Sequence, residues 1–114
     1  MDLDVRQSGN TCTLKLKGPF KSPDSVRDFD RAVEAALSNG HVYLILDLEA
    51  MPIIDSCGIG AIVNALRQSK KSGGDAKLVN PSPFAKKTFK MVGILGLFDS
   101  FTSEADAMDA CSRL

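Results

Sequence analysis

The stretch that decides the fold runs from His41 to Gly58 and reads HVYLILDLEAMPIIDSCG. Its first eight residues are almost continuously apolar, which predicts a strand buried on both faces. The last four, Asp55-Ser56-Cys57-Gly58, are polar or small, and apolar residues then recur at helical spacing as far as Leu66. This pattern predicts a turn from a central strand into a helix, with Ser56 at the start of that helix.

Ser56 has three candidate roles at such a position. A helix start exposes unpaired backbone N–H groups and the positive end of the helix dipole, so a negative group is favoured there. The hydroxyl could cap the helix, serve as a nucleophile or carry a phosphate. Asp55 is either a cap or part of a recognition surface, and Cys57 is either a small packed residue or a thiol of lowered pKa. Gly58 and Gly60 are expected to let the helix pack closely against the strand.

Segments before this stretch form a predicted hairpin and a helix. Residues 2–6 and 12–17 alternate apolar and polar side chains around a turn at 8–10, which predicts a β-hairpin. A helix is predicted from Ser22-Pro23 to Asn39-Gly40, because serine is a favoured N-cap, proline suits the first helical position and glycine ends helices.

The C-terminal half continues the alternation of strands and helices. A strand is predicted at 76–79, a helix from Ser82-Pro83 to Gly93, a last strand within 97–101 and a final helix after Ser103. An apolar face of the final helix would consist of Ala107, Ala110, Cys111 and Leu114. The whole order predicts one α/β domain, with a mixed sheet of about five strands and about four helices mainly on one face.

Composition narrows the classes of function. The 114 residues contain 14 Lys and Arg against 14 Asp and Glu, so no basic excess points to nucleic acid or to an anionic membrane. The chain has three cysteines without a CxxC pair and one histidine, His41, which are few ligands for a metal site. No cofactor is expected. Without a stretch of signal-peptide or membrane-spanning length, a cytoplasmic protein with no direct membrane insertion is expected.

The Asp-Ser-Cys-Gly step and its surroundings resemble the STAS family, which includes the bacterial anti-sigma-factor antagonists. The resemblance covers nearly the whole chain, residues 1–114, and is carried by the N-terminal hairpin, Leu46-Asp47-Leu48, Asp55-Ser56-Cys57-Gly58-Ile59-Gly60, Leu78-Val79-Asn80 and Met91-Val92-Gly93 with Leu97-Phe98. In that family the serine directly after the aspartate is phosphorylated by a partner kinase, which implies phosphorylation of Ser56. The implied partners are an anti-sigma factor that is a serine kinase of the histidine-kinase ATPase type, and a PP2C-like phosphatase.

A phosphate on Ser56 is expected to act on the surface rather than on the fold. It adds about −1.5 to −2 charges at pH 7, and a helix start favours such charge by about 0.3–1 kcal/mol. The predicted partner-binding residues are Ile53, Ile54, Asp55, Ser56, Cys57 and Gly58, with one of the two isoleucines facing the core. Lys86, Lys87 and Lys90, on the predicted third helix, form either a solvated face or a contact for an acidic partner.

Two other functions remain as alternatives. The loop Gly18-Pro19-Phe20-Lys21 lacks the acidic residue that the antagonists commonly carry there, which favours a STAS module in a transport or stress-signalling assembly that is not switched by phosphate. An enzyme with Ser56 or Cys57 as nucleophile would need a nearby base. At about 3.3 Å per residue, His41 lies more than about 20 Å from Ser56 along the predicted strand. The sequence therefore predicts a regulatory binding protein and not an enzyme.

Overall fold

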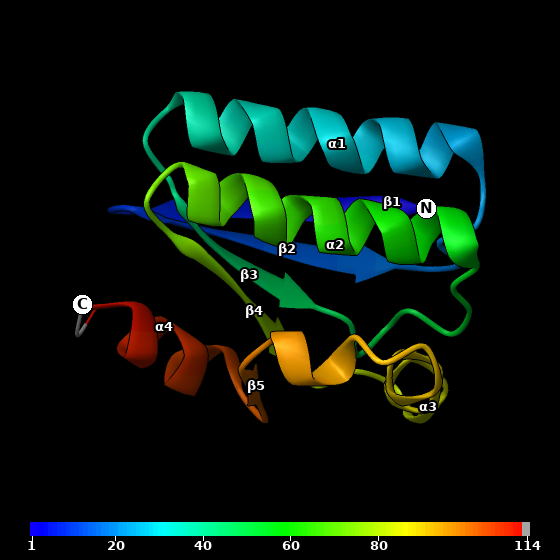
Figure 1. Ribbon diagram of the computed structural model, residues 1–114. Coiled ribbons are helices and arrows are strands. Elements are labelled where there is room, and N and C mark those ends of the chain that lie inside the picture. Colours follow the sequence, from blue (N-terminus) through cyan, green and yellow to red (C-terminus); the bar gives the residue numbers. More distant parts are fainter. Residues whose placement is uncertain (113–114) are drawn as a thin grey trace.

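A five-stranded mixed sheet is the centre of the computed structural model, which describes residues 1–112 (Figure 1). The strands lie in chain order: β1 (Asp2–Ser8), β2 (Thr11–Lys17), β3 (Tyr43–Asp47), β4 (Asp75–Val79) and β5 (Ser100–Phe101). β1 pairs antiparallel with β2, and all later pairs are parallel. The predicted hairpin and the α/β class with a mixed sheet are confirmed.

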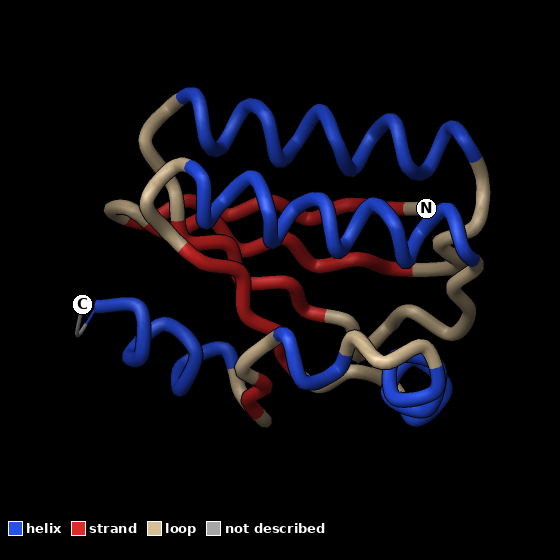
Figure 2. Tube along the Cα trace, in the orientation of Figure 1, coloured by secondary structure: helices blue, strands red, loops and turns tan. Residues whose placement is uncertain are grey.

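The helices are α1 (Pro23–Ser38), α2 (Ser56–Lys71), α3 (Pro83–Met91) and α4 (Glu104–Ser112), with a short 3-10 helix η1 at Leu95–Leu97. Figure 2 shows α1 and α2 side by side along one face of the sheet, with α4 on the other side. α3 adds Phe89 to the core that α1 and α2 cover. Within residues 1–112, no helix is both long and apolar enough to cross a membrane.

The strand β3 is buried on both faces, as its apolar run predicts. Leu44 and Leu46 belong to the main core under α1 and α2. Ile45 points the other way and packs with Ala107 and Cys111 of α4. Of the apolar face predicted for the last helix, Leu114 lies outside the described residues.

Serine side chains cap two helices as the sequence predicts. The Ser22 Oγ accepts a hydrogen bond from the backbone N–H of Ser25 at 3.0 Å at the start of α1. The Ser82 Oγ accepts one from Ala85 N at 3.2 Å at the start of α3. A proline follows each cap, where its missing N–H costs no hydrogen bond.

The last strand is shorter than predicted. Within the predicted range 97–101, only Ser100 and Phe101 pair with β4. The chain before them is turned rather than extended, because the Leu97 N–H donates to the Ile94 carbonyl at 3.0 Å and closes η1. The apolar run around Leu97 therefore belongs partly to a turn.

Candidate functional site

The turn before α2 and the loop after β2 form one hydrogen-bonded unit at the carboxyl edge of the parallel strands. Phe20 and Ile54 make an isolated parallel bridge. The Phe20 N–H donates to the Ile53 carbonyl at 2.8 Å, and the Asp55 N–H donates to the Phe20 carbonyl at 3.3 Å. The Phe20 ring is fully buried and lies 5.2 Å, between ring centroids, from Phe29 of α1. The loop that departs from the antagonist pattern therefore supports the Asp-Ser turn directly.

Asp55, not Ser56, caps α2. The Asp55 Oδ1 accepts hydrogen bonds from Cys57 N at 3.0 Å and Gly58 N at 3.1 Å. Ser56 is the first helical residue, as predicted, but the capping role considered for its hydroxyl is wrong. The Ser56 side chain is exposed, and its hydroxyl has no hydrogen-bond partner among residues 1–112. Two backbone N–H groups at the helix start that were expected to be available to a phosphate therefore already donate to Asp55.

Gly58 lies where α2 closely approaches the supporting loop. A Cβ at this position would lie 2.5 Å from the Phe20 carbonyl oxygen and 2.8 Å from Ile54 Cγ1. The predicted close packing is therefore right for Gly58, although its neighbour is the Phe20 loop and not the strand. It is wrong for Gly60, where a Cβ would meet nothing within 4 Å.

Of the two isoleucines before the turn, one is buried and the other is exposed, as predicted. Ile54 faces the core and Ile53 is 43% exposed. Met51, three residues before Ile54, is fully buried. Its carbonyl accepts a hydrogen bond from the Ser82 Oγ at 2.9 Å, which ties the start of α3 to the segment that leads into the site.

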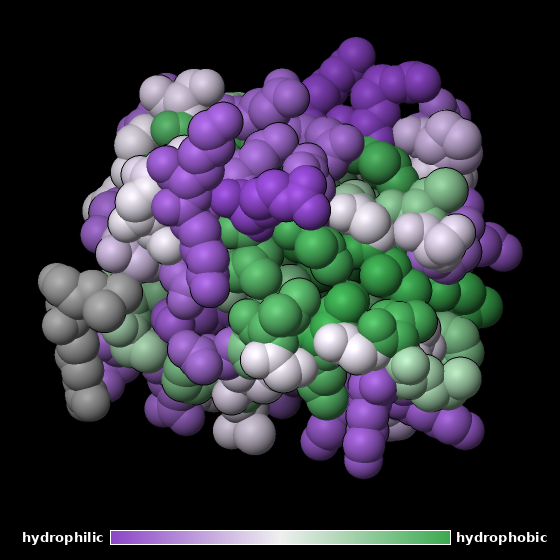
Figure 3. Space-filling view, in the orientation of Figure 1, coloured by the Kyte–Doolittle hydropathy of each residue, from purple (hydrophilic) through white to green (hydrophobic). Residues whose placement is uncertain are grey.

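A second group of exposed apolar side chains lies on α3 and η1. Phe84, Met91, Val92 and Leu97 are 48%, 77%, 53% and 52% exposed. Figure 3 shows a broad apolar area over α2, α3 and η1 in this view. Sequence signals predicted this helix from its ends and did not divide its apolar residues between faces. Their spacing could have separated them, because Phe84 and Met91 are seven apart on one stripe while Ala85 and Phe89 share another.

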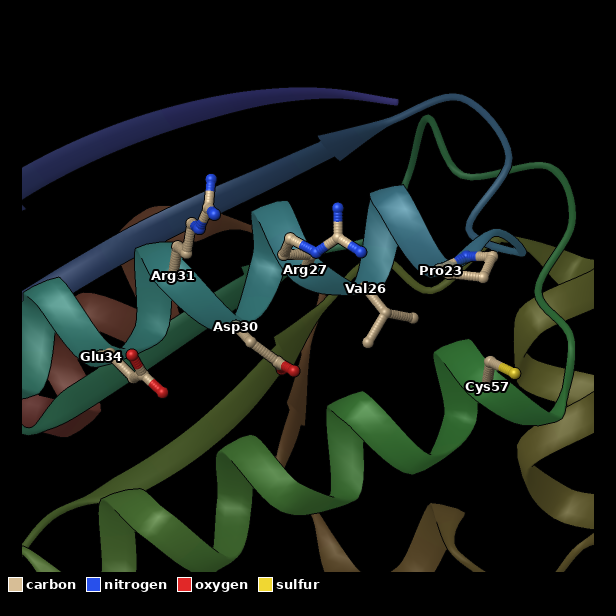
Figure 4. Close-up of a pocket in the computed structure, with 7 residues that line it drawn as sticks. All are labelled: Pro23, Val26, Arg27, Asp30, Arg31, Glu34 and Cys57. Carbon is tan, nitrogen blue, oxygen red and sulfur yellow. The ribbon is translucent and has the colours of Figure 1, made fainter.

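A groove lies between α1 and α2, with Cys57 at one end (Figure 4). Its volume is about 480 Å³. In Figure 4 the Asp30 side chain points from α1 toward α2. Burial, and secondarily the charge of Glu34, raise the pKa of the Asp30 carboxyl. Cys57 is exposed there, so the prediction of a small residue packed at the turn is wrong.

The described residues around Ser56 do not supply a histidine base or a cluster of metal ligands. The His41 Nδ1 lies 2.7 Å from the Gly9 carbonyl oxygen, in the β1–β2 turn at the opposite edge of the sheet. Within residues 1–112 no three His, Cys, Asp or Glu side chains gather as metal ligands. The thiols of Cys12, Cys57 and Cys111 are free. The exposed Ser56 hydroxyl therefore lies beside the capping Asp55 with no cluster of metal ligands among residues 1–112.

This fold is that of a STAS domain. The STAS domain family matches residues 2–107, and the chain belongs to that family. A relative, the anti-sigma F factor antagonist of Lysinibacillus sphaericus, is 31% identical over 100 residues, which are 87% of this chain and 84% of the relative.

Solved structures share the fold at lower sequence identity. The unphosphorylated anti-sigma factor antagonist SpoIIAA has a TM-score of 0.86 at 23% identity, over 99% of this chain and 98% of that one. The phosphorylated form of SpoIIAA, a Bacillus cell fate determinant, has a TM-score of 0.78 at 23% identity, over 96% and 98%. A sulfate transporter family protein of Wolinella succinogenes has a TM-score of 0.71 at 19% identity, over 89% and 84%.

Proposed function

We propose that this protein is an anti-sigma-factor antagonist that binds an anti-sigma factor through residues 53–58 and is released when Ser56 is phosphorylated. The observation that carries the proposal is the exposed Ser56 hydroxyl, which directly follows the capping Asp55 and has no hydrogen-bond partner among residues 1–112. The relative named as an anti-sigma F factor antagonist supports the role. The fold shared with both phosphorylated and unphosphorylated SpoIIAA supports the switch.

The docking surface begins at Ile53, whose exposed side chain stands three residues before Ser56. Ile54 and Gly58 hold the turn from beneath, Ile54 as a buried anchor and Gly58 by its close approach to Phe20. Burial of an exposed isoleucine by a partner contributes about 1.5–3 kcal/mol at most. In the unmodified protein this apolar contact and the neutral serine favour binding.

A phosphate would oppose binding through charge and hydration. Because Asp55 already occupies the N–H groups of Cys57 and Gly58, the phosphate cannot replace it there without removing the cap. It would project from the surface with about −1.5 to −2 charges beside the Asp55 carboxylate. A partner that covers Ile53 would then have to desolvate two neighbouring negative groups, which costs free energy unless each is paired.

The chemistry of the switch belongs to the partners. A serine kinase of the histidine-kinase ATPase type would transfer the γ-phosphoryl group of ATP to the Ser56 Oγ, release ADP and take up the hydroxyl proton. A PP2C-like phosphatase would add water across the phosphoester and return the hydroxyl with free phosphate. This chain supplies the acceptor and the docking surface and is not itself an enzyme. The need for ATP and the three free thiols suit the cytoplasm.

A STAS module without a phosphate switch is the second candidate. It is favoured by the loop Gly18–Lys21, which supports the turn and has Pro, Phe and Lys after Gly18, without the acidic residue that the antagonists commonly carry. The likeness in fold to a sulfate transporter family protein is compatible with such a role.

Calorimetry with the purified cognate anti-sigma factor separates the two candidates. We expect Ser56→Ala to bind as wild type does and to resist phosphorylation by the kinase and ATP. Ser56→Asp should bind at least about tenfold more weakly, equivalent to about 1.4 kcal/mol, and the phosphorylated protein at least as weakly. The matched control is Ser8→Asp, at an exposed position at the opposite edge of the sheet. Equal affinity of all forms would replace the switch with the second candidate.

A further inference from the structure

We propose that α3 and η1 carry a basic-rimmed apolar surface that docks an acidic, amphipathic segment of a partner protein. The surface consists of Phe84, Met91, Val92 and Leu97 with Lys87 and Lys90. It extends the docking turn of the proposed function. Its chemistry, however, rests on α3 itself and does not depend on a switch at Ser56.

The apolar part of this surface is large for side chains that have no role in the core. Met91 is 77% exposed, and the other three are each about half exposed. The core needs a different stripe of the helix, since Ala85 and Phe89 are fully buried. Phe84 and Met91 are two helical turns apart, about 10.5 Å at 1.5 Å per residue, which matches two turns of a helix laid against them.

The rim of the surface is basic. Lys87 lies on the same stripe, three residues after Phe84, and Lys90 is adjacent to Met91 in sequence. The side chains of Lys86, Lys87 and Lys90 are exposed and form no ion pair with any of residues 1–112. Residues 83–98 contain three lysines and no acidic residue, although the chain as a whole has a net charge of zero.

The excess of lysine on this surface indicates the charge of the partner that it binds. Unpaired lysines around an apolar centre favour carboxylates at the rim of the partner and disfavour a basic partner. A second copy bound about a two-fold axis through this surface would bring the same lysines and no carboxylate of residues 83–98 to the contact, which costs free energy. The surface is joined to the turn before α2 by the bond between Ser82 Oγ and the Met51 carbonyl, so one partner could cover both.

The test uses two probe peptides and NMR of the isotopically labelled full chain. One is an 18-residue amphipathic helix of leucine and glutamate, and the other has lysine in place of glutamate. We expect the acidic peptide to shift backbone signals across residues 84–97, and the basic peptide to leave them unchanged. The charge-reversed variant K87E/K90E should lose at least about tenfold in affinity for the acidic peptide. Equal binding of both peptides, or no shift by either, would overturn the proposal.

A matched control reverses two lysines elsewhere. K70E/K71E changes the same number of charges at the far end of α2, about 21–22 Å along that helix from Ser56, and should bind the acidic peptide as wild type does. Loss of affinity in both double variants would mean a nonspecific charge effect and would overturn the proposal. Thermal unfolding of each variant by circular dichroism verifies that it is folded before titration.

Two measurements distinguish the other occupants and the proposed function. Sedimentation that finds a dimer abolished by Met91→Ser would assign the surface to a second copy. Co-sedimentation with phosphatidylserine vesicles that depends on Lys87 and Lys90, without binding of the acidic peptide, would assign it to a membrane. Ser56→Asp should leave the affinity for the peptide unchanged. The peptide result and the switch at Ser56 can therefore fail separately.

Discussion

Replacing Gly58 with alanine should destabilise the site from within. The added Cβ would lie 2.5 Å from the Phe20 carbonyl oxygen, which is backbone and also accepts the Asp55 N–H. Overpacking of this kind costs about 1–3 kcal/mol, and the better helix propensity of alanine returns at most about 1 kcal/mol. We expect a net loss of about 1–2 kcal/mol in the free energy of unfolding, measured by urea denaturation with detection by circular dichroism.

Gly60→Ala is the matched control, because it makes the same substitution two residues later in the same helix. A Cβ at Gly60 meets nothing within 4 Å, so the propensity gain is unopposed and the free energy of unfolding should rise by up to about 1 kcal/mol. The two variants should therefore move in opposite directions. If Gly58→Ala is as stable as Gly60→Ala, the contact between α2 and the Phe20 loop does not constrain the turn, and this account of the site fails.

Further predictions concern the cap, a buried ring and a buried thiol. Asp55→Ala should cost about 0.5–2 kcal/mol of unfolding free energy, whereas Ser56→Ala should change it by less than about 0.5 kcal/mol; the reverse order in urea denaturation would contradict the capping assignment. Phe20→Ala should cost about 3–5 kcal/mol in the same assay, and a loss below about 1 kcal/mol would mean that the ring does not anchor the loop. Burial raises the pKa of the Cys12 thiol, so the unfolded chain ionises first and stability falls as pH rises above about 8.5. Between pH 8 and 10 Cys12→Ala should lose less stability than wild type, and equal slopes would refute this.

The sequence predicted the elements whose signals are local. The caps at Ser22 and Ser82, each followed by proline, are confirmed because a cap needs only the backbone of the next turn. The central strand is confirmed because a continuous apolar run must be buried on both faces. Placement of Ser56 at a helix start followed from the change between these two patterns.

Features that depend on residues far along the chain could not be predicted from the sequence. Asp55 and Ser56 are both good N-caps, and the bond from Asp55 N to the Phe20 carbonyl sets which of them precedes the first helical turn. Likewise, Gly58 and Gly60 look alike in sequence, and only the approach of the Phe20 loop distinguishes them. Periodicity marks the apolar residues of α3 but does not say that Met91 stays uncovered.

Asp55 caps α2 and Ser56 does not, and this difference determines how a phosphate on Ser56 could act. If Ser56 were the cap, its modification would remove a side chain that holds the helix start, and the change in charge would be coupled to stability. Because Asp55 carries the cap, the Ser56 hydroxyl holds nothing in place among residues 1–112. A phosphate there can alter the surface charge by about −1.5 to −2 while the hydrogen bonds of the turn persist. The same separation predicts that affinity for a partner and stability of the fold respond to different substitutions, the first to Ser56 and the second to Asp55.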